Sequence, residues 1–192
     1  MKKRILSLFL IFAMVLGMVP AMVFAESKIV NNTNLSLNGG KADCPVCGKN
    51  VTWSALSGTL TATKWPQPDT HYYLTGDVTY TGTDYGFGYA KSETQTTCLH
   101  LNGHNITSTT GKAASFGGGV VNIMGNGIVS GAGTAYGGAT IHTWGDGTLN
   151  LYGGTYTKGA SQYPVIFLNA YTLNMYDGTT VEGKGTTPAT IR

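Results

Sequence analysis

The segment CPVCGK contains the residues best suited to chemistry in this chain. Cys44 and Cys47 form a CPxCG knuckle, a turn that can present two thiolates to one metal ion. A zinc site takes four ligands, and the remaining candidates are Cys98, His71, His100 and His104. Cys98 begins the first clear repeat and His71 begins the strand-like stretch HYYLTGDVTY. We therefore predict a structural zinc site in a group named here the cysteine–histidine cluster: Cys44, Cys47, His71 and Cys98.

Residues 1–25 predict a secretory signal peptide. Lys2, Lys3 and Arg4 precede an apolar run, and Val23 and Ala25 occupy positions −3 and −1 of a cleavage site. Pro20 and the cleavage site disfavour the alternative, an uncleaved signal anchor. We therefore expect a secreted or cell-surface protein. Without the three basic leader residues, nine basic residues balance nine acidic ones, which predicts neither nucleic-acid binding nor, after cleavage, membrane binding.

The secreted context keeps other uses of the cysteines open. Outside the cell thiols oxidise, so three cysteines can also give one disulfide and one free thiol. A disulfide between Cys44 and Cys47 would close a very short loop. Zinc, a disulfide and unpaired thiols therefore remain three alternatives at this point.

Acidic residues are sparse, and no two of the nine are adjacent or two apart. Asp146 and Asp177 belong to the regular repeats but fall at different corners, where each precedes glycine as turn residues do. Arg192 is the one arginine outside the leader. We expect His100 and His142 to face solvent from strand segments. No catalytic triad follows from the spacing, so the sequence favours binding or a structural role over an enzyme while leaving enzymatic activity undecided.

The elements that must position these residues come from a repeat of about two dozen residues. Four copies carry an apolar pair with a spacing of two, and the second members are separated by 22, 28 and 24 residues. Spacing by two is the period of a strand with one buried face. Glycine or aspartate follows each pair and suits a sharp corner. The aligned pairs, which we expect to point inward, are Leu99/Leu101, Val121/Ile123, Leu149/Leu151 and Leu173/Met175.

One such unit cannot bury its apolar face, but stacked units can. Three short strands per unit without helical periodicity predict an all-β, right-handed parallel β-helix with an N-terminal cap. A β-sandwich with evenly spaced strands is the alternative, but the repeats agree in register as well as in spacing. In this interpretation residues 26–43 are a linker, residues 44–70 the cap and residues 71–192 the β-helix. Residues 179–192 begin a further coil, so we expect a truncated chain that can associate end to end.

The residues between the inward positions should form an outward ladder of amides and aromatic rings. Amide donors beside aromatic faces suit sugar rings, although stacked identical side chains also stabilise solenoids on their own. The predicted glycan-binding residues are Asn122, Asn150, Tyr152, Asn174 and Tyr176.

The stretches HYYLTGDVT, CLHLNGHNIT and LNLYGGTYT together resemble secreted bacterial β-helix proteins of the pectate-lyase-like superfamily. The resemblance covers residues 70–192, and CPVCGK is similar to a segment found ahead of such coils. It implies the fold more than the activity, because this solenoid hosts many functions. Enzymes of the group imply clustered acidic residues that bind calcium, or paired carboxylates for glycoside hydrolysis, and this sequence has neither.

Two functions follow from these observations. The first is a secreted or cell-surface β-helix module, structural or adhesin-like, that binds a polysaccharide or glycan on its outer strand face. The alternative is the N-terminal part of a polysaccharide lyase or glycoside hydrolase whose catalytic coils lie beyond residue 192.

Overall fold

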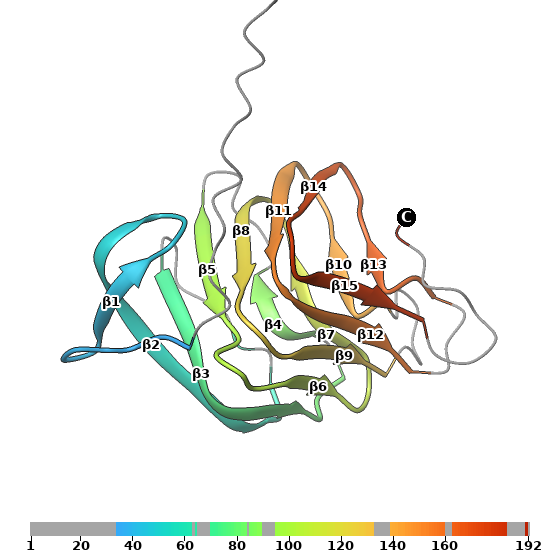
Figure 1. Ribbon diagram of the computed structural model, residues 1–192. Coiled ribbons are helices and arrows are strands. Elements are labelled where there is room, and N and C mark those ends of the chain that lie inside the picture. The colour runs from blue at the N-terminus through green and yellow to red at the C-terminus, as the bar shows by residue number, and fades with distance from the viewer. Residues whose placement is uncertain are drawn as a thin grey trace, which may run out of the picture.

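The protein is an all-β solenoid (Figure 1). The computed structural model describes residues 34–62, 64, 70–83, 85–89, 95–132, 139–159, 163–183 and 191. The predicted leader lies outside these residues. The described part contains strands and turns but no helix, and so none that could cross a lipid bilayer.

Parallel pairs of equivalent strands build three faces. On the first face β3 (Thr70–Tyr80) is followed by β5 (Thr96–His100), β8 (Gly119–Met124), β11 (Gly147–Tyr152) and β14 (Tyr171–Met175). The second face continues from β3 through β6 (Ile106–Ser108), β9 (Ile128–Gly131), β12 (Gly154–Lys158) and β15 (Thr179–Glu182). The third face consists of β4 (Tyr85–Tyr89), β7 (Lys112–Phe116), β10 (Ile141–Thr143) and β13 (Ile166–Phe167). This arrangement confirms the predicted parallel β-helix with three short strands per coil.

Corner glycines join the first face to the second, as the repeat predicts. Gly103, Gly125 and Gly178 have φ angles of 81°, 83° and 85°, a region that a side chain disfavours. The long strand β3 makes the same bend, because residues 70–73 pair with β5 and residues 78–80 pair with β6.

The register between β5 and β8 differs from the predicted alignment. Leu149 pairs with Val121 and Leu173 pairs with Leu149, as expected. Leu99, however, pairs with Ile123 and not with Val121, so the first copy is offset by two residues from the predicted alignment. A shift of two leaves every side chain on its original face, which is why the apolar pattern could not detect it. The correction brings Cys98, rather than His100, beside the strand position of Asn122.

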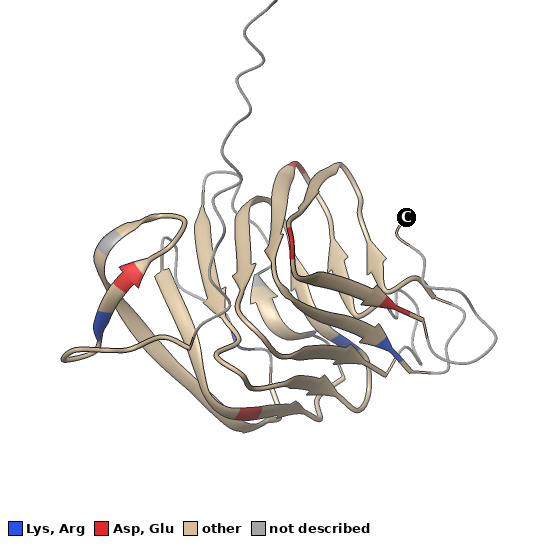
Figure 2. Cartoon of the chain, in the orientation of Figure 1, with Lys and Arg blue, Asp and Glu red and all other residues tan. Residues whose placement is uncertain are grey.

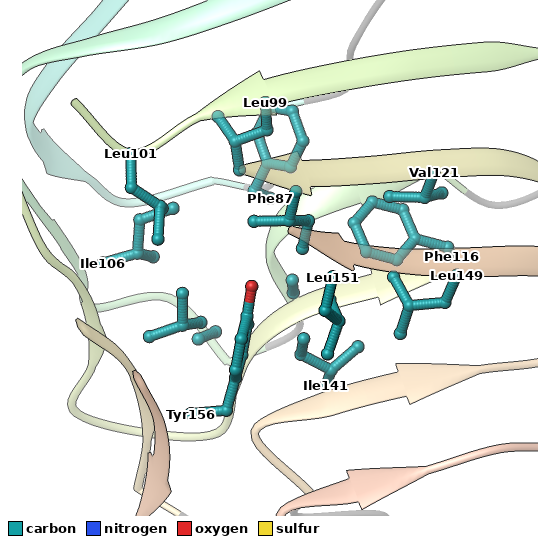
Figure 3. Packing of buried hydrophobic residues seen from close by; sticks show 14 of the residues in the cluster. Phe87, Leu99, Leu101, Ile106, Phe116, Val121, Ile141, Leu149, Leu151 and Tyr156 are labelled. Carbon is teal, nitrogen blue, oxygen red and sulfur yellow. The ribbon is translucent and has the colours of Figure 1, made fainter. Parts of the chain in front are cut away.

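The interior of the coils is a continuous apolar core (Figure 3). Leu99, Leu101, Val121, Ile123, Leu149 and Leu151 are at most 1% exposed, as predicted, and Leu173 packs against them partly buried. Phe87 and Phe116 extend this core from the third face, with ring centroids 6.2 Å apart. Met175 pairs in register with Leu151 and so lies on the predicted inner face, but it is 42% exposed because none of the described strands stacks on β14.

The N-terminal strands form a hairpin at one end of the stack. β1 (Lys41–Cys44) pairs antiparallel with β2 (Gly48–Leu60), and β2 pairs in parallel with β3 along both halves of its length. β2 therefore follows the course of a coil although it precedes residue 71. Figure 1 shows the β1–β2 hairpin at the left, beside β3 and at the end of the stack opposite β14.

Candidate metal centre

The cysteine–histidine cluster is assembled from β1, the turn after it, β3 and β5. Cys44 ends β1 and Cys47 lies in the turn, so the hairpin supplies two members. His71 and Cys98 are register partners in the β3–β5 pair. Their chain neighbours Tyr72 and Leu99 belong to the interior core, and alternation along a strand therefore places His71 and Cys98 on the outer face.

The four side chains have the spacing that a single cation requires. One ligand atom from each residue lies within 4.8 Å of all the others, so the cluster could hold a metal ion. The Cys44 and Cys98 sulfur atoms are 3.9 Å apart. Tetrahedral zinc with Zn–S bonds of about 2.3 Å separates two sulfurs by about 3.8 Å. A disulfide needs about 2.05 Å, and none joins the three cysteines of this structure.

His71 supplies an independent test of whether a cation fits. Its Nε2 atom is buried and has no hydrogen-bond partner, which is costly for a polar atom removed from water. A metal ion would satisfy the nitrogen lone pair. The Trp53 ring contacts the imidazole edge-on, with ring centroids 5.1 Å apart, and so restricts the orientation of the His71 ring.

Without a cation, the thiol of Cys44 loses its proton more readily than the thiol of Cys98 does. Hydrogen bonds from Cys47 and Cys98 lower the pKa of Cys44, and its sulfur also accepts the Cys47 backbone N–H at 3.3 Å. Contacts with Cys44 and Cys47, together with burial, raise the pKa of Cys98. Three thiolates this close repel one another. A divalent cation would provide the positive charge that allows all three to ionise.

A second apolar cluster surrounds the centre on the outer face. Trp53, Met124 and the two buried cysteines form it, and partly buried side chains of the N-terminal segment, together with one tyrosine each from β3 and β11, pack against it. Those flanking residues are Leu35, Leu37, Ala42, Val46, Val51, Tyr73 and Tyr152. The N-terminal segment therefore covers part of the face that the sequence places in solvent.

His100 lies on the same outer face, edge-on to the Trp53 ring of β2, with ring centroids 6.2 Å apart. It is 1% exposed, and its Nδ1 accepts the backbone N–H of Asn102 at 3.0 Å. Burial lowers the pKa of His100 to about 4, despite the nearby Cys44. The expectation that His100 faces solvent is thus wrong. Gly125 leaves room for the ring, since a Cβ there would lie 2.5 Å from His100 Cε1.

The predicted glycan-binding residues form the expected ladders but differ in exposure. Asn122, Asn150 and Asn174 are hydrogen-bonded in a row, and the rings of Tyr152 and Tyr176 stack 4.3 Å apart at 9°. Asn122 is 2% exposed and Asn150 8%, whereas the other three residues are partly exposed. Sequence reasoning found these residues, but not that Asn122 contacts the cysteines, because that contact depends on the corrected register.

Acidic residues are scattered singly over the described ribbon (Figure 2). Asp146 and Asp177 are exposed, in turns of different coils. Asp77 lies 3.8 Å from His104 in a solvent-exposed pair. Within the described residues, the cysteine–histidine cluster is the one group of three or more His, Cys, Asp or Glu side chains that could hold a metal ion.

Searches against known protein families, curated proteins and solved structures find no match to this chain. The fold and the cluster geometry therefore carry the functional argument.

Proposed function

We propose that this chain is a secreted or cell-surface β-helix module with a structural, adhesin-like role, whose N-terminal hairpin is fastened to the coils by zinc. The observation that carries the proposal is the convergence of the cysteine–histidine cluster within 4.8 Å. Three thiolates and one imidazole are a common donor set for structural zinc, which needs no open coordination position.

The position of the cluster explains what the zinc ion would do. Cys44 and Cys98 are 54 residues apart in sequence. His71 lies on β3, between β1 and β5 in the order of the chain. One ion would therefore hold β1 and its turn against β3 and β5. The superfamily resemblance and the predicted leader support secretion, where a small N-terminal hairpin needs such a fastening against unfolding.

Metal analysis tests this proposal. The chain purified under reducing conditions should contain about one zinc per molecule. Cys98→Ser and His71→Ala should lose the metal, whereas His104→Ala should retain it because His104 lies outside the cluster, beside Asp77. Wild-type protein that is folded, reduced and free of metal after zinc addition would contradict the proposal.

A glycan-binding surface is a second candidate, narrowed to Tyr152, Asn174 and Tyr176. It is supported by two parallel stacked rings, both partly exposed, next to a partly exposed amide. Sugar rings pack on such aromatic faces. Affinity electrophoresis against soluble plant and bacterial polysaccharides should show retardation that Tyr176→Ala abolishes. Phe167→Ala, which removes a partly exposed ring from the third face, is the matched control.

The polysaccharide lyase or hydrolase remains the alternative to a structural role. It requires a carboxylate pair or cluster, and Asp146 and Asp177 stand apart in the described coils. Release of unsaturated or reducing sugar ends by the purified chain would favour this alternative over the structural module.

A further inference from the structure

The metal-binding residues His71 and Cys98 are the first rungs of a longer ladder on the outer face. The register of successive strands places Cys98 beside Asn122, Asn122 beside Asn150, and Asn150 beside Asn174. The ladder thus runs from the cysteine–histidine cluster across β8 and β11 to β14.

The hydrogen bonds of this ladder all run in one direction. Asn174 Nδ2 donates to Asn150 Oδ1 at 2.8 Å, and Asn150 Nδ2 donates to Asn122 Oδ1 at 2.9 Å. Asn122 Nδ2 then donates to the Cys98 sulfur at 3.4 Å and lies 3.9 Å from the Cys47 sulfur. Each amide therefore presents its positive end toward the cysteines.

This direction is the one that ionised cysteines need. A thiolate has no proton to donate, so it requires a donor, and hydrogen bonds to a charged acceptor are the stronger kind. One divalent cation with three thiolates and a neutral imidazole has a net charge of about −1. That charge lies beside Asn122, which is 2% exposed, where water contributes little solvation.

The remaining amides strengthen the donor. Hydrogen bonds in a row polarise one another, so Asn150 and Asn174 make Asn122 Nδ2 a better donor than an isolated amide would be. Asn150 also fixes the orientation of the Asn122 side chain by occupying its oxygen. The effect on the donor strength of Asn122 is expected to be smaller for Asn174 than for Asn150, because Asn174 lies farther from the sulfur atoms.

We infer that Asn122 is the positioning residue of the metal centre, and that Asn150 and Asn174 support it, so that metal affinity depends on coils that contain no ligand. This inference rests on the proposed metal centre. Side chains that are hydrogen-bonded to metal ligands commonly change metal affinity by 10- to 100-fold when they are replaced.

The test compares metal affinity along the ladder. Asn122→Asp is the sharpest variant, because its carboxylate keeps the acceptor for Asn150 and loses the donor to sulfur. Chelator competition should show zinc affinity reduced by roughly 10- to 100-fold for Asn122→Asp, less for Asn150→Leu and least for Asn174→Leu. Thr148→Val, on the same strand and face as Asn150 but outside the ladder, should bind as wild type does.

Cobalt(II) substitution provides a spectrum that should stay unchanged if Asn122 only supported the fold. The sulfur-to-cobalt charge-transfer band of Asn122→Asp should shift relative to wild type and Thr148→Val, because the electron density on Cys98 changes. Equal affinities and equal spectra for wild type and Asn122→Asp would overturn the inference and leave the metal centre intact. A wild-type chain that binds neither zinc nor cobalt would overturn the metal centre itself. If Asn122→Asp fails to fold, Asn150→Leu decides by the same two measurements.

Discussion

The two apolar clusters of this protein are built on different principles. The interior core is repetitive: each coil contributes Leu, Ile or Val at equivalent positions, and these side chains together fill the interior of the solenoid. The cluster on the outer face is assembled once, from Cys44, Trp53, Cys98 and Met124, with His71 in contact. Repetition allows different apolar residues to fill equivalent interior positions, whereas the outer cluster depends on particular side chains from distant parts of the chain.

The largest expected effect comes from opening a cavity in the interior core. Leu151 is fully buried, and Leu151→Ala should reduce the free energy of unfolding by roughly 2–5 kcal/mol. Chemical denaturation monitored by circular dichroism measures it. Met175→Ala is the control from the neighbouring register position, and its exposed side chain should make the change small. Equal losses for the two variants would contradict the assigned core.

Metal removal should act on the outer cluster and leave the interior intact. With free zinc about 100-fold above its dissociation constant, chelation should lower the free energy of opening the β1–β2 hairpin by about 3 kcal/mol. Amide hydrogen exchange should therefore speed up in residues 41–53 and remain slow in β8 and β11. Uniform acceleration along the chain would show that the hairpin and the coils do not respond separately.

The smallest effect is a pH dependence on the third face, remote from the cysteines. Burial, aided by Lys112, lowers the pKa of His142 to about 4, below the value of about 6.5 in an unfolded chain. The unfolded state therefore binds more protons in this window, and stability present above pH 6.5 is lost as the pH falls toward 4. We expect this proton uptake to lower the free energy of unfolding by about 1 kcal/mol at pH 5, a value discounted because His142 is partly exposed.

His142→Phe should reduce the slope of this part of the stability profile, and the part that remains includes the buried His100, whose pKa is also about 4. The ring would join its register partner Phe167, whose centroid already lies 5.2 Å from the imidazole. Thermal unfolding at pH 5 and pH 7 provides the comparison, and His104→Phe is the control because His104 is more exposed. A pH profile unchanged by His142→Phe would assign the acid sensitivity to another group.

Sequence reasoning was sufficient for features that repeat and insufficient for those that occur once. The apolar pairs predict the coils because every copy gives the same signal. The spacing of Cys44 and Cys47, with His71 and Cys98 near one end of the repeats, predicts the members of the cluster. The fold of residues 34–47 over the outer face could not be predicted, because no periodic pattern marks it. Nor does any periodic pattern mark the contact between the Trp53 ring and His100, so the exposure expected for His100 is wrong.

Two pairings of β5 with β8, offset by two residues, both satisfy the apolar pattern around Leu99. The slipped pairing of β5 with β8 would keep Leu99 and Leu101 inside, so the apolar interior distinguishes the two pairings poorly. The outer face distinguishes them sharply. If β5 stayed in place beside β3, the slip would move Asn122 by about 6.6 Å along the strand, two residues away from Cys98. The hydrogen bond from Asn122 to Cys98 would be lost in the slipped pairing, so it favours the observed register over the alternative that the apolar pattern permits.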